Sequence, residues 1–236
     1  IFDFPTVSQM AEFLATQLGG AIAEVSLESQ VVATQGDSIG VIGMSCYAPG
    51  GCGSTHELWN MLCHGRDSVE KVPKSRFDVD ALDNTPSQLY VKQGHFLRDV
   101  ELFDNMHFGI GAAEAKEMDP QQRLLLEVGF DALHAAGHSK ETLMGKDVGV
   151  FVGISISDWR ALQCDMGRVF SSYTNHGFDT GSAAGRLSYI LGMKGPCFIV
   201  NTACSSSMVT LDSACQALSL GRCSSALVAG VNLQLH

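Results

Sequence analysis

Basic residues are missing from the opening part of this 236-residue chain. Residues 1–65 contain no lysine or arginine, and the whole chain has a formal net charge of −10. The same segment carries the acidic residues Asp3, Glu12, Glu24, Glu28, Asp37 and Glu57. Because a surface of that sign repels phosphate backbones, we expect no nucleic-acid binding.

Long apolar runs are also absent. The longest, such as residues 148–154, are far shorter than the roughly 20 residues that a membrane-spanning helix needs. No basic segment followed by an apolar core marks a secretory signal peptide. We therefore expect no membrane span and a cytoplasmic location, with a plastid or another organelle left open. The first residue is not Met, so we also expect that the chain was cut from a longer protein.

The eight cysteines lack the spacing of a metal site or of a disulfide framework. No pair is separated as in C-x-x-C, and no Cys/His cluster follows zinc-finger spacing. Disulfide frameworks belong mainly to small secreted domains, so we expect reduced thiols, most of them buried as small hydrophobes. His134 and His138 share a predicted helix face without a third ligand nearby, which favours a surface pair over a metal pair. We expect no bound metal ion.

The chain divides into three segments by composition. Residues 6–9 form a capping-box pattern that predicts a short helix through about Leu18. Residues 19–37 are small and polar with scattered aliphatics, which is typical of a linker. A new domain is predicted to open at residue 38, with a short strand over residues 38–44.

Strands and helices alternate after residue 38. Ser54 and Asp119 are predicted helix N-caps, and residues 65–118 are expected to be largely irregular. Further helices are predicted over residues 179–191 and 205–220, and apolar strands over 147–154, 197–202 and 225–231. Because these strands are continuous apolar runs, we expect a largely parallel sheet with helices on both faces.

One strand-to-helix junction carries a candidate nucleophile, Cys204. A thiol at a helix N-terminus lies beside unpaired backbone N–H groups and the positive end of the helix dipole, which favour the nucleophilic thiolate. The same N–H groups could hold the oxyanion formed when a thioester carbonyl is attacked. The alternative is a buried, unreactive cysteine. The spacing of four apolar residues predicts the buried face of the helix that follows: Met208, Leu211, Cys215 and Leu218.

Several motifs around this junction resemble those of modular polyketide ketosynthases. Residues 201–207 (Asn-Thr-Ala-Cys-Ser-Ser-Ser) are similar to the family's nucleophile motif, and residues 117–127 are similar to its long helix. Asn201 stands where the family usually has Asp, and Gly185 stands where Asn is expected. Shorter matching segments occur in the family's order at residues 39–44, 48–51, 103–104, 108–110, 148–155, 186–189 and 229–232.

The resemblance implies a fold and a domain order. The fold would be a thiolase-like α/β architecture of α-β-α-β-α layers, with this chain supplying mainly the first half. Residues 38–236 would be the N-terminal part of a ketosynthase domain, truncated at its end. Residues 1–18 look like the end of an acyl carrier domain, with residues 19–37 as the linker. An unrelated amphipathic helix is the alternative for residues 1–18.

The resemblance also implies a reaction in a polyketide or fatty acid synthase. Cys204 would accept an acyl group from a carrier-bound thioester, and a malonyl-type extender would then lose carbon dioxide and attack that group. The implied partners are an acyl carrier protein domain, acyl and malonyl thioesters, and a second copy of the chain in a homodimer. No cofactor would bind directly, because the carrier delivers the phosphopantetheine arm.

Two histidines and a lysine of the family's site would lie beyond residue 236, so we expect residues 1–236 alone to be inactive. One alternative function is a non-catalytic ketosynthase-like dimer scaffold or docking module. Another is a thiolase-type condensing enzyme, and a hydrolase is more distant because no G-x-S-x-G accompanies the serines after Cys204.

Overall fold

A computed structural model describes residue 13 and residues 38–81, 91–167 and 171–235. The chain divides into two units, Ile1–Ser38 and Ile39–His236, and every element below belongs to the second. The helix predicted over residues 6–18 and the linker predicted over 19–37 lie outside the described residues, apart from Phe13.

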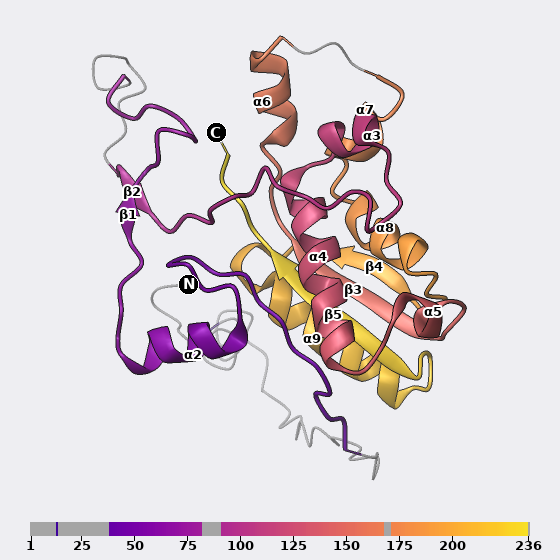
Figure 1. Ribbon diagram of the computed structural model, residues 1–236. Helices are drawn as coiled ribbons and strands as arrows, with labels where there is room; N and C mark the ends of the chain where they lie inside the picture. Colours follow the sequence, from indigo (N-terminus) through magenta and orange to yellow (C-terminus); the bar gives the residue numbers. More distant parts are fainter. Residues whose placement is uncertain (1–12, 14–37, 82–90, 168–170, 236) are drawn as a thin grey trace. The chain divides into compact units, whose positions relative to one another are not determined.

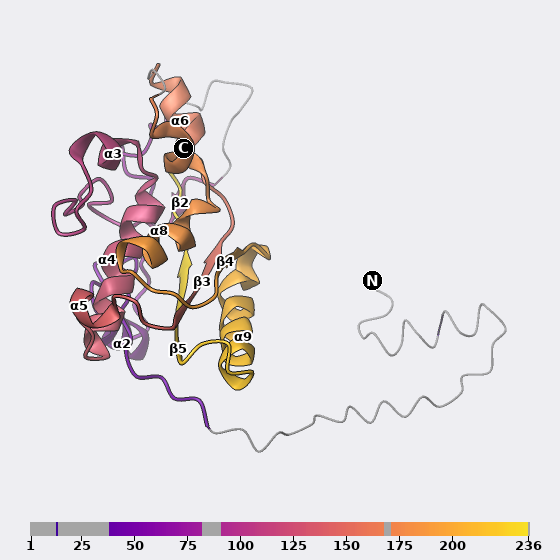
Figure 2. The same cartoon turned by 90° about the vertical axis from the view of Figure 1, so that its right-hand side faces the viewer.

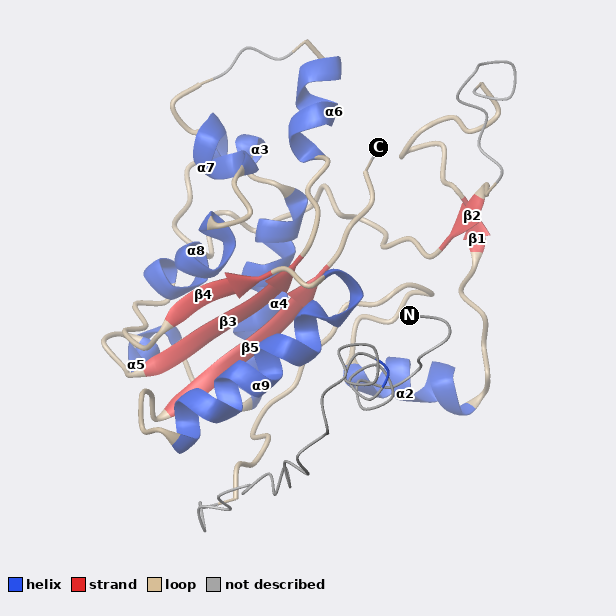
Figure 3. Ribbon diagram, turned by 180° about the vertical axis from the view of Figure 1, so that it is seen from behind, coloured by secondary structure: helices blue, strands red, loops and turns tan. Residues whose placement is uncertain are grey.

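The centre of the second unit is a three-stranded parallel sheet in the order β4-β3-β5 (Figure 3). It consists of β3 (Val148–Ile154), β4 (Cys197–Val200) and β5 (Ser225–Val231). Both outer strands run parallel to β3, and every residue of β3 is buried. The predicted parallel sheet of apolar strands is therefore confirmed, although β4 ends two residues earlier than expected.

Helices cover both faces of this sheet, as predicted (Figure 2). One face holds α4 (Pro120–Ala135) and α8 (Ser182–Ile190), and the other holds α9 (Ser206–Ser219) (Figure 1). Successive side chains of β3 point to opposite faces. Val150 and Val152 therefore join the core of α4 and α8, whereas Phe151 packs with Ala214 and Ala217 of α9.

Local capping signals set the starts of two helices where the sequence placed them. The Ser54 hydroxyl accepts a hydrogen bond from the Glu57 N–H at the start of α2 (Thr55–Cys63). The Asp119 carboxylate accepts one from the Gln121 N–H at 2.7 Å, directly before Pro120 opens α4. Both caps satisfy backbone donors that have no partner within the helix.

Several short elements were not predicted. The stretch before α4 contains a small antiparallel pair, β1 (Glu70–Lys71) and β2 (Gln93–Gly94), and the helix α3 (Ala112–Glu117). Three more helices are α5 (Lys140–Leu143), α6 (Trp159–Asp165) and α7 (Thr174–Phe178). Each is too short for hydrophobic periodicity to reveal it.

The strand predicted over residues 38–44 is wrong. Within the described residues this segment pairs with no strand, and Val41 and Ile42 are exposed. The segment passes close to the end of α4, since a Cβ on Gly43 would lie 2.3 Å from the Ala132 carbonyl oxygen. Packing against a helix provides no ladder of hydrogen bonds, so the apolar pattern alone does not produce a strand.

The predicted buried face of α9 is right only in its second half, where Cys215 and Leu218 are partly buried and Leu218 packs against the core around Phe151. Met208 and Leu211 are exposed, and the buried residues of the helix are Ser206, Thr210, Ala214 and Ala217. The start of the helix lies so close to Gly153 and Gly230 of the sheet that only small side chains fit there. The buried Thr210 hydroxyl donates to the Ser206 and Ser207 carbonyl oxygens at 3.0 and 2.8 Å, so it needs no partner in the sheet.

Candidate active site

Cys204 lies in the short connection between β4 and α9. It is the middle residue of a 3₁₀ turn, Ala203–Ser205, and α9 begins directly afterwards at Ser206. The structure therefore places Cys204 at the predicted junction, and its side chain is exposed.

The residue before Cys204 has an unusual backbone conformation. Ala203 has a φ of +55°, and the only other described non-glycine residue with positive φ is Asp99. For an L-residue with a Cβ this left-handed conformation costs about 1–2 kcal/mol. Such strain persists only where the surrounding structure holds it, and here it lies within the five residues that turn the chain from β4 into α9.

Hydrogen bonds fix the backbone on both sides of Cys204. The Ala203 N–H donates to the Asn201 side-chain oxygen at 3.1 Å, and the Thr202 N–H donates to the Ser206 hydroxyl at 2.9 Å. The Ser206 hydroxyl in turn donates to the Ala203 carbonyl at 2.7 Å, and the Ser205 hydroxyl donates to the Thr202 carbonyl at 2.8 Å. The thiol is thus exposed on a backbone that is held by its neighbours' side chains.

Two glycines in the sheet allow the start of α9 to approach it. A Cβ on Gly153 of β3 would lie 2.8 Å from the Ser206 carbonyl carbon and from the Ser207 nitrogen. A Cβ on Gly230 of β5 would lie 2.1 Å from the Ser207 hydroxyl oxygen. These contacts were not predicted, although a glycine inside a predicted buried strand is a known sign of close backbone approach.

The start of α4 organises the loops that leave the sheet. Gln121 is fully buried, its amide N–H donates to the Ile156 carbonyl at 2.9 Å, and its oxygen accepts from the Leu233 N–H at 3.2 Å. Ile156 follows β3 and Leu233 follows β5, so one side chain joins the loops after both strands. The neighbouring Asp119 accepts from Ser157 in the same loop. Burial raises the pKa of Asp119, and the hydrogen bonds from Ser157 and Gln121 oppose that rise.

Gln122 connects the same helix to α7 and α8. Its amide N–H group donates to the carbonyls of His176 and Asp179 at 3.0 and 3.1 Å. Its oxygen accepts from the Arg186 Nε at 3.0 Å, and Arg186 also forms an ion pair with Glu114. The segment at residues 117–127, which resembles a family motif, therefore connects the loops after β3 and β5 with α7 and α8.

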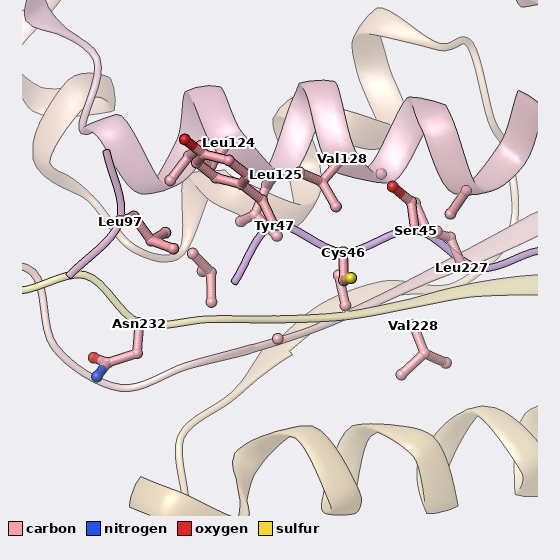
Figure 4. A pocket seen from close by; sticks show the side chains of 15 residues that line it. Ser45, Cys46, Tyr47, Leu97, Leu124, Leu125, Val128, Leu227, Val228 and Asn232 are labelled. Carbon is pink, nitrogen blue, oxygen red and sulfur yellow. The ribbon is translucent and has the colours of Figure 1, made fainter. Parts of the chain in front are cut away.

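A separate cavity of about 250 Å³ lies between residues 45–47, α4 and β5 (Figure 4). Cys46 and Tyr47 line it together with Leu124 and Val128 of α4, and Cys204 does not. Burial, with smaller effects of Cys52 and Glu57, raises the pKa of the Cys46 thiol. A raised pKa disfavours the thiolate, which is the nucleophilic form of cysteine.

The remaining cysteines lack the placement of Cys204. All eight are free, and Cys63, Cys164 and Cys197 are the other exposed ones. Although the Cys197 residue is exposed overall, partial burial of its thiol raises its pKa, and a hydrogen bond with Ser188 opposes that rise. Among the described residues, no three His, Cys, Asp or Glu side chains gather as metal ligands would. No helix in the described ranges is long and apolar enough to cross a bilayer.

Comparison with known proteins identifies the relatives of this chain. The family model "Beta-ketoacyl synthase, N-terminal domain" matches residues 36–236. The chain is 39% identical over 238 residues to polyketide synthase GfsB of Streptomyces halstedii, covering 99% of the chain and 4% of that protein. It is 37% identical over 238 residues to erythronolide synthase EryA2 of Saccharopolyspora erythraea, covering 99% of the chain and 7% of that protein. The chain thus spans a small part of each curated relative.

Solved structures with the same fold are similar in sequence as well. The ketosynthase from module 6 of the bacillaene synthase of Bacillus subtilis 168 matches with a TM-score of 0.68 and 37% identity, over 82% of this chain and 31% of that one. The oxazolomycin ketosynthase domain OzmH KS7 of Streptomyces albus JA3453 matches with a TM-score of 0.74 and 32% identity, over 83% of this chain and 34% of that one. In each case the chain spans about a third of the solved domain.

Proposed function

Because the chain belongs to the β-ketoacyl synthase family and has its thiolase-like fold, we propose that Cys204 is the acyl-accepting nucleophile of a condensing enzyme. The observation that carries this proposal is the exposed thiol between the strained Ala203 and the start of α9. The reaction is a decarboxylative Claisen condensation in a polyketide or fatty acid synthase.

The first stage is acyl transfer. The Cys204 sulfur attacks the carbonyl carbon of an acyl thioester, and a new C–S bond forms while the bond to the donor's sulfur breaks. The donor leaves as a thiolate that takes up a proton. The positive end of the α9 dipole, directly after Cys204, favours the negative charge of the oxyanion that forms in this step.

The second stage is carbon–carbon bond formation. A malonyl-type thioester loses carbon dioxide, and its carbanion attacks the acyl carbon on Cys204, so the Cys204 sulfur is released and a β-ketoacyl product forms. The family resemblance places two histidines that assist decarboxylation, and a lysine that supports the site, downstream of Cys204. We therefore assign that role to groups outside residues 1–236, in keeping with a chain that spans about a third of the solved ketosynthases.

The partners are those of a synthase module. An acyl carrier protein domain delivers the thioesters on a phosphopantetheine arm, and a second copy of the chain completes a homodimer. Among the described strands, β4 and β5 each have a neighbour on one side only, and the exposed Cys197 and Phe198 on the β4 edge support the homodimer. An unpaired strand edge presents backbone groups that another strand can satisfy.

Residues 1–18 are assigned to the end of a carrier domain, residues 19–37 to a linker and residues 38–236 to the ketosynthase. The division of the chain after Ser38 and the family match from residue 36 support the last boundary. The free cysteines support a cytoplasmic location.

The test uses the complete protein that carries this chain, treated with an acyl N-acetylcysteamine thioester. We expect the acyl mass on the peptide that contains Cys204, and its loss in Cys204→Ala. Cys164→Ala, which removes another exposed thiol, should acylate normally. Acylation of a different cysteine would refute the assignment, and no acylation of the wild type would favour a non-catalytic scaffold.

A further inference from the structure

The side chain of Asn201 joins two backbone segments beside Cys204. Its Nδ2 donates to the Ser155 carbonyl at 3.0 Å, and its Oδ1 accepts from the Ala203 N–H at 3.1 Å. A backbone N–H can only donate and a carbonyl can only accept, so one orientation of the amide satisfies both contacts. Ser155 directly follows β3, and Asn201 directly follows the neighbouring strand β4.

The Ser155 side of this connection is firmly held. The next two residues are bound to the buried start of α4: the Ile156 carbonyl accepts from Gln121, and the Ser157 hydroxyl donates to Asp119. Asp119 and Gln121 are buried, with 2% and 0% of their surface exposed. Asn201 is therefore attached to a part of the loop that two buried side chains keep in place.

The Ala203 side is the strained side. Its left-handed φ of +55° is unfavourable for a residue with a Cβ, so the conformation depends on the contacts that hold it. The Asn201 oxygen holds the N–H of Ala203, and the Ser206 hydroxyl holds its carbonyl. Relaxation of Ala203 would rotate the peptide that leads into Cys204 and would move the thiol relative to the start of α9.

We propose that Asn201 is a positioning residue for the acylation of Cys204. Its oxygen keeps Ala203 in the left-handed conformation, and its amide N–H group fixes the side chain itself to the Ser155 carbonyl. This inference rests on the proposed function, because it names a residue that acts on the nucleophile through the backbone. Asn201 makes no contact with the substrate in this role.

Two substitutions separate the two contacts. Asn201→Ala removes both, and Asn201→Asp keeps an oxygen that can accept from Ala203 but loses the donor to Ser155. For the acyl thioester reaction, we expect the maximal rate of Asn201→Ala to fall about tenfold, a modest loss for two hydrogen bonds. Asn201→Asp should fall by no more than about threefold. The thioester concentration at half-maximal rate should not change in either variant.

Asn105→Ala is the matched control. It also removes a hydrogen bond from an asparagine Nδ2 to a backbone carbonyl, that of Ile110 at 2.6 Å, in the loop before α3. The complete protein and its three variants are compared by acylation rate, followed by peptide mass spectrometry, and by thermal unfolding. We expect Asn105→Ala to acylate Cys204 at the wild-type rate.

Three results would overturn the inference: wild-type acylation by Asn201→Ala, equal impairment of both Asn201 variants, or a rate loss in Asn201→Ala that Asn105→Ala shares. Each of these leaves the proposed function standing, because the wild type still acylates Cys204. A wild type that does not acylate Cys204 would instead remove the proposed function and this inference with it.

Discussion

Substituting Gly153 by alanine should move the start of α9 away from the sheet. The added Cβ would lie 2.8 Å from the Ser206 carbonyl carbon and the Ser207 nitrogen, and both are backbone atoms. Ordinary van der Waals contact begins at 3.4 Å, so the helix start must retreat by about 0.6 Å. No side-chain rotation can relieve this contact.

The magnitude follows from two opposing effects. Forcing an extra methyl group into a packed interior costs about 1–3 kcal/mol. Alanine also restricts the unfolded chain relative to glycine, which returns about 0.4–1 kcal/mol. The expected net loss is therefore about 1–2 kcal/mol, which lowers the melting temperature of a domain of this size by about 2–8 °C. The acylation rate of Cys204 should fall as well, because the displaced atoms lie two and three residues after it.

Matched substitutions test the physical reason. In Gly230→Ala the closest atom is the Ser207 hydroxyl oxygen, at 2.1 Å, so combining it with Ser207→Ala should recover part of the lost stability. In Gly185→Ala, within α8, nothing lies within 4 Å of the new Cβ, and helix propensity should raise stability by up to about 1 kcal/mol. Thermal unfolding of the complete protein and acylation kinetics measure these effects. A Gly153→Ala variant as stable and as reactive as the wild type would refute the reasoning.

Two further predictions concern Ala203 and Asp119. Ala203→Gly removes the left-handed strain and should raise the free energy of unfolding by about 1 kcal/mol. Ala203→Val should lower the free energy of unfolding, because a β-branched residue fits this conformation poorly. Equal stability of the two variants in urea unfolding would contradict the prediction. Burial raises the pKa of Asp119 in the folded protein above its ordinary 3.8, so the folded state favours the protonated carboxyl group. The stability that this group contributes is complete below pH 3.8 and is lost as the pH rises through the raised pKa. The free energy of unfolding of the wild type, compared with that of Asp119→Asn, should therefore decrease as the pH rises through this range. Urea unfolding at several pH values measures the difference, and a difference that does not change with pH would count against the prediction.

The sequence by itself determined the order of the main elements and the position of the candidate nucleophile. Short-range signals were sufficient for this. Ser54 and Asp119 cap the helices that they were predicted to cap. The apolar runs at residues 148–154 and 225–231 form parallel strands, of which the first is fully buried and the second mostly half-buried. Cys204 lies between strand and helix as its motif indicated. Each of these features depends on residues within a few positions of one another.

The tertiary structure decided the features that depend on distant contacts. Periodicity predicted that Met208 and Leu211 face the core, but close contact with Gly153 and Gly230 leaves room only for small side chains on that face of α9. Residues 38–44 have the composition of a strand, yet they pass the end of α4 with no partner strand among the residues that the structure describes. The contact between Asn201 and Ser155 joins residues 46 positions apart. Such contacts form only when separate elements pack together, so no local pattern in the chain could have specified them.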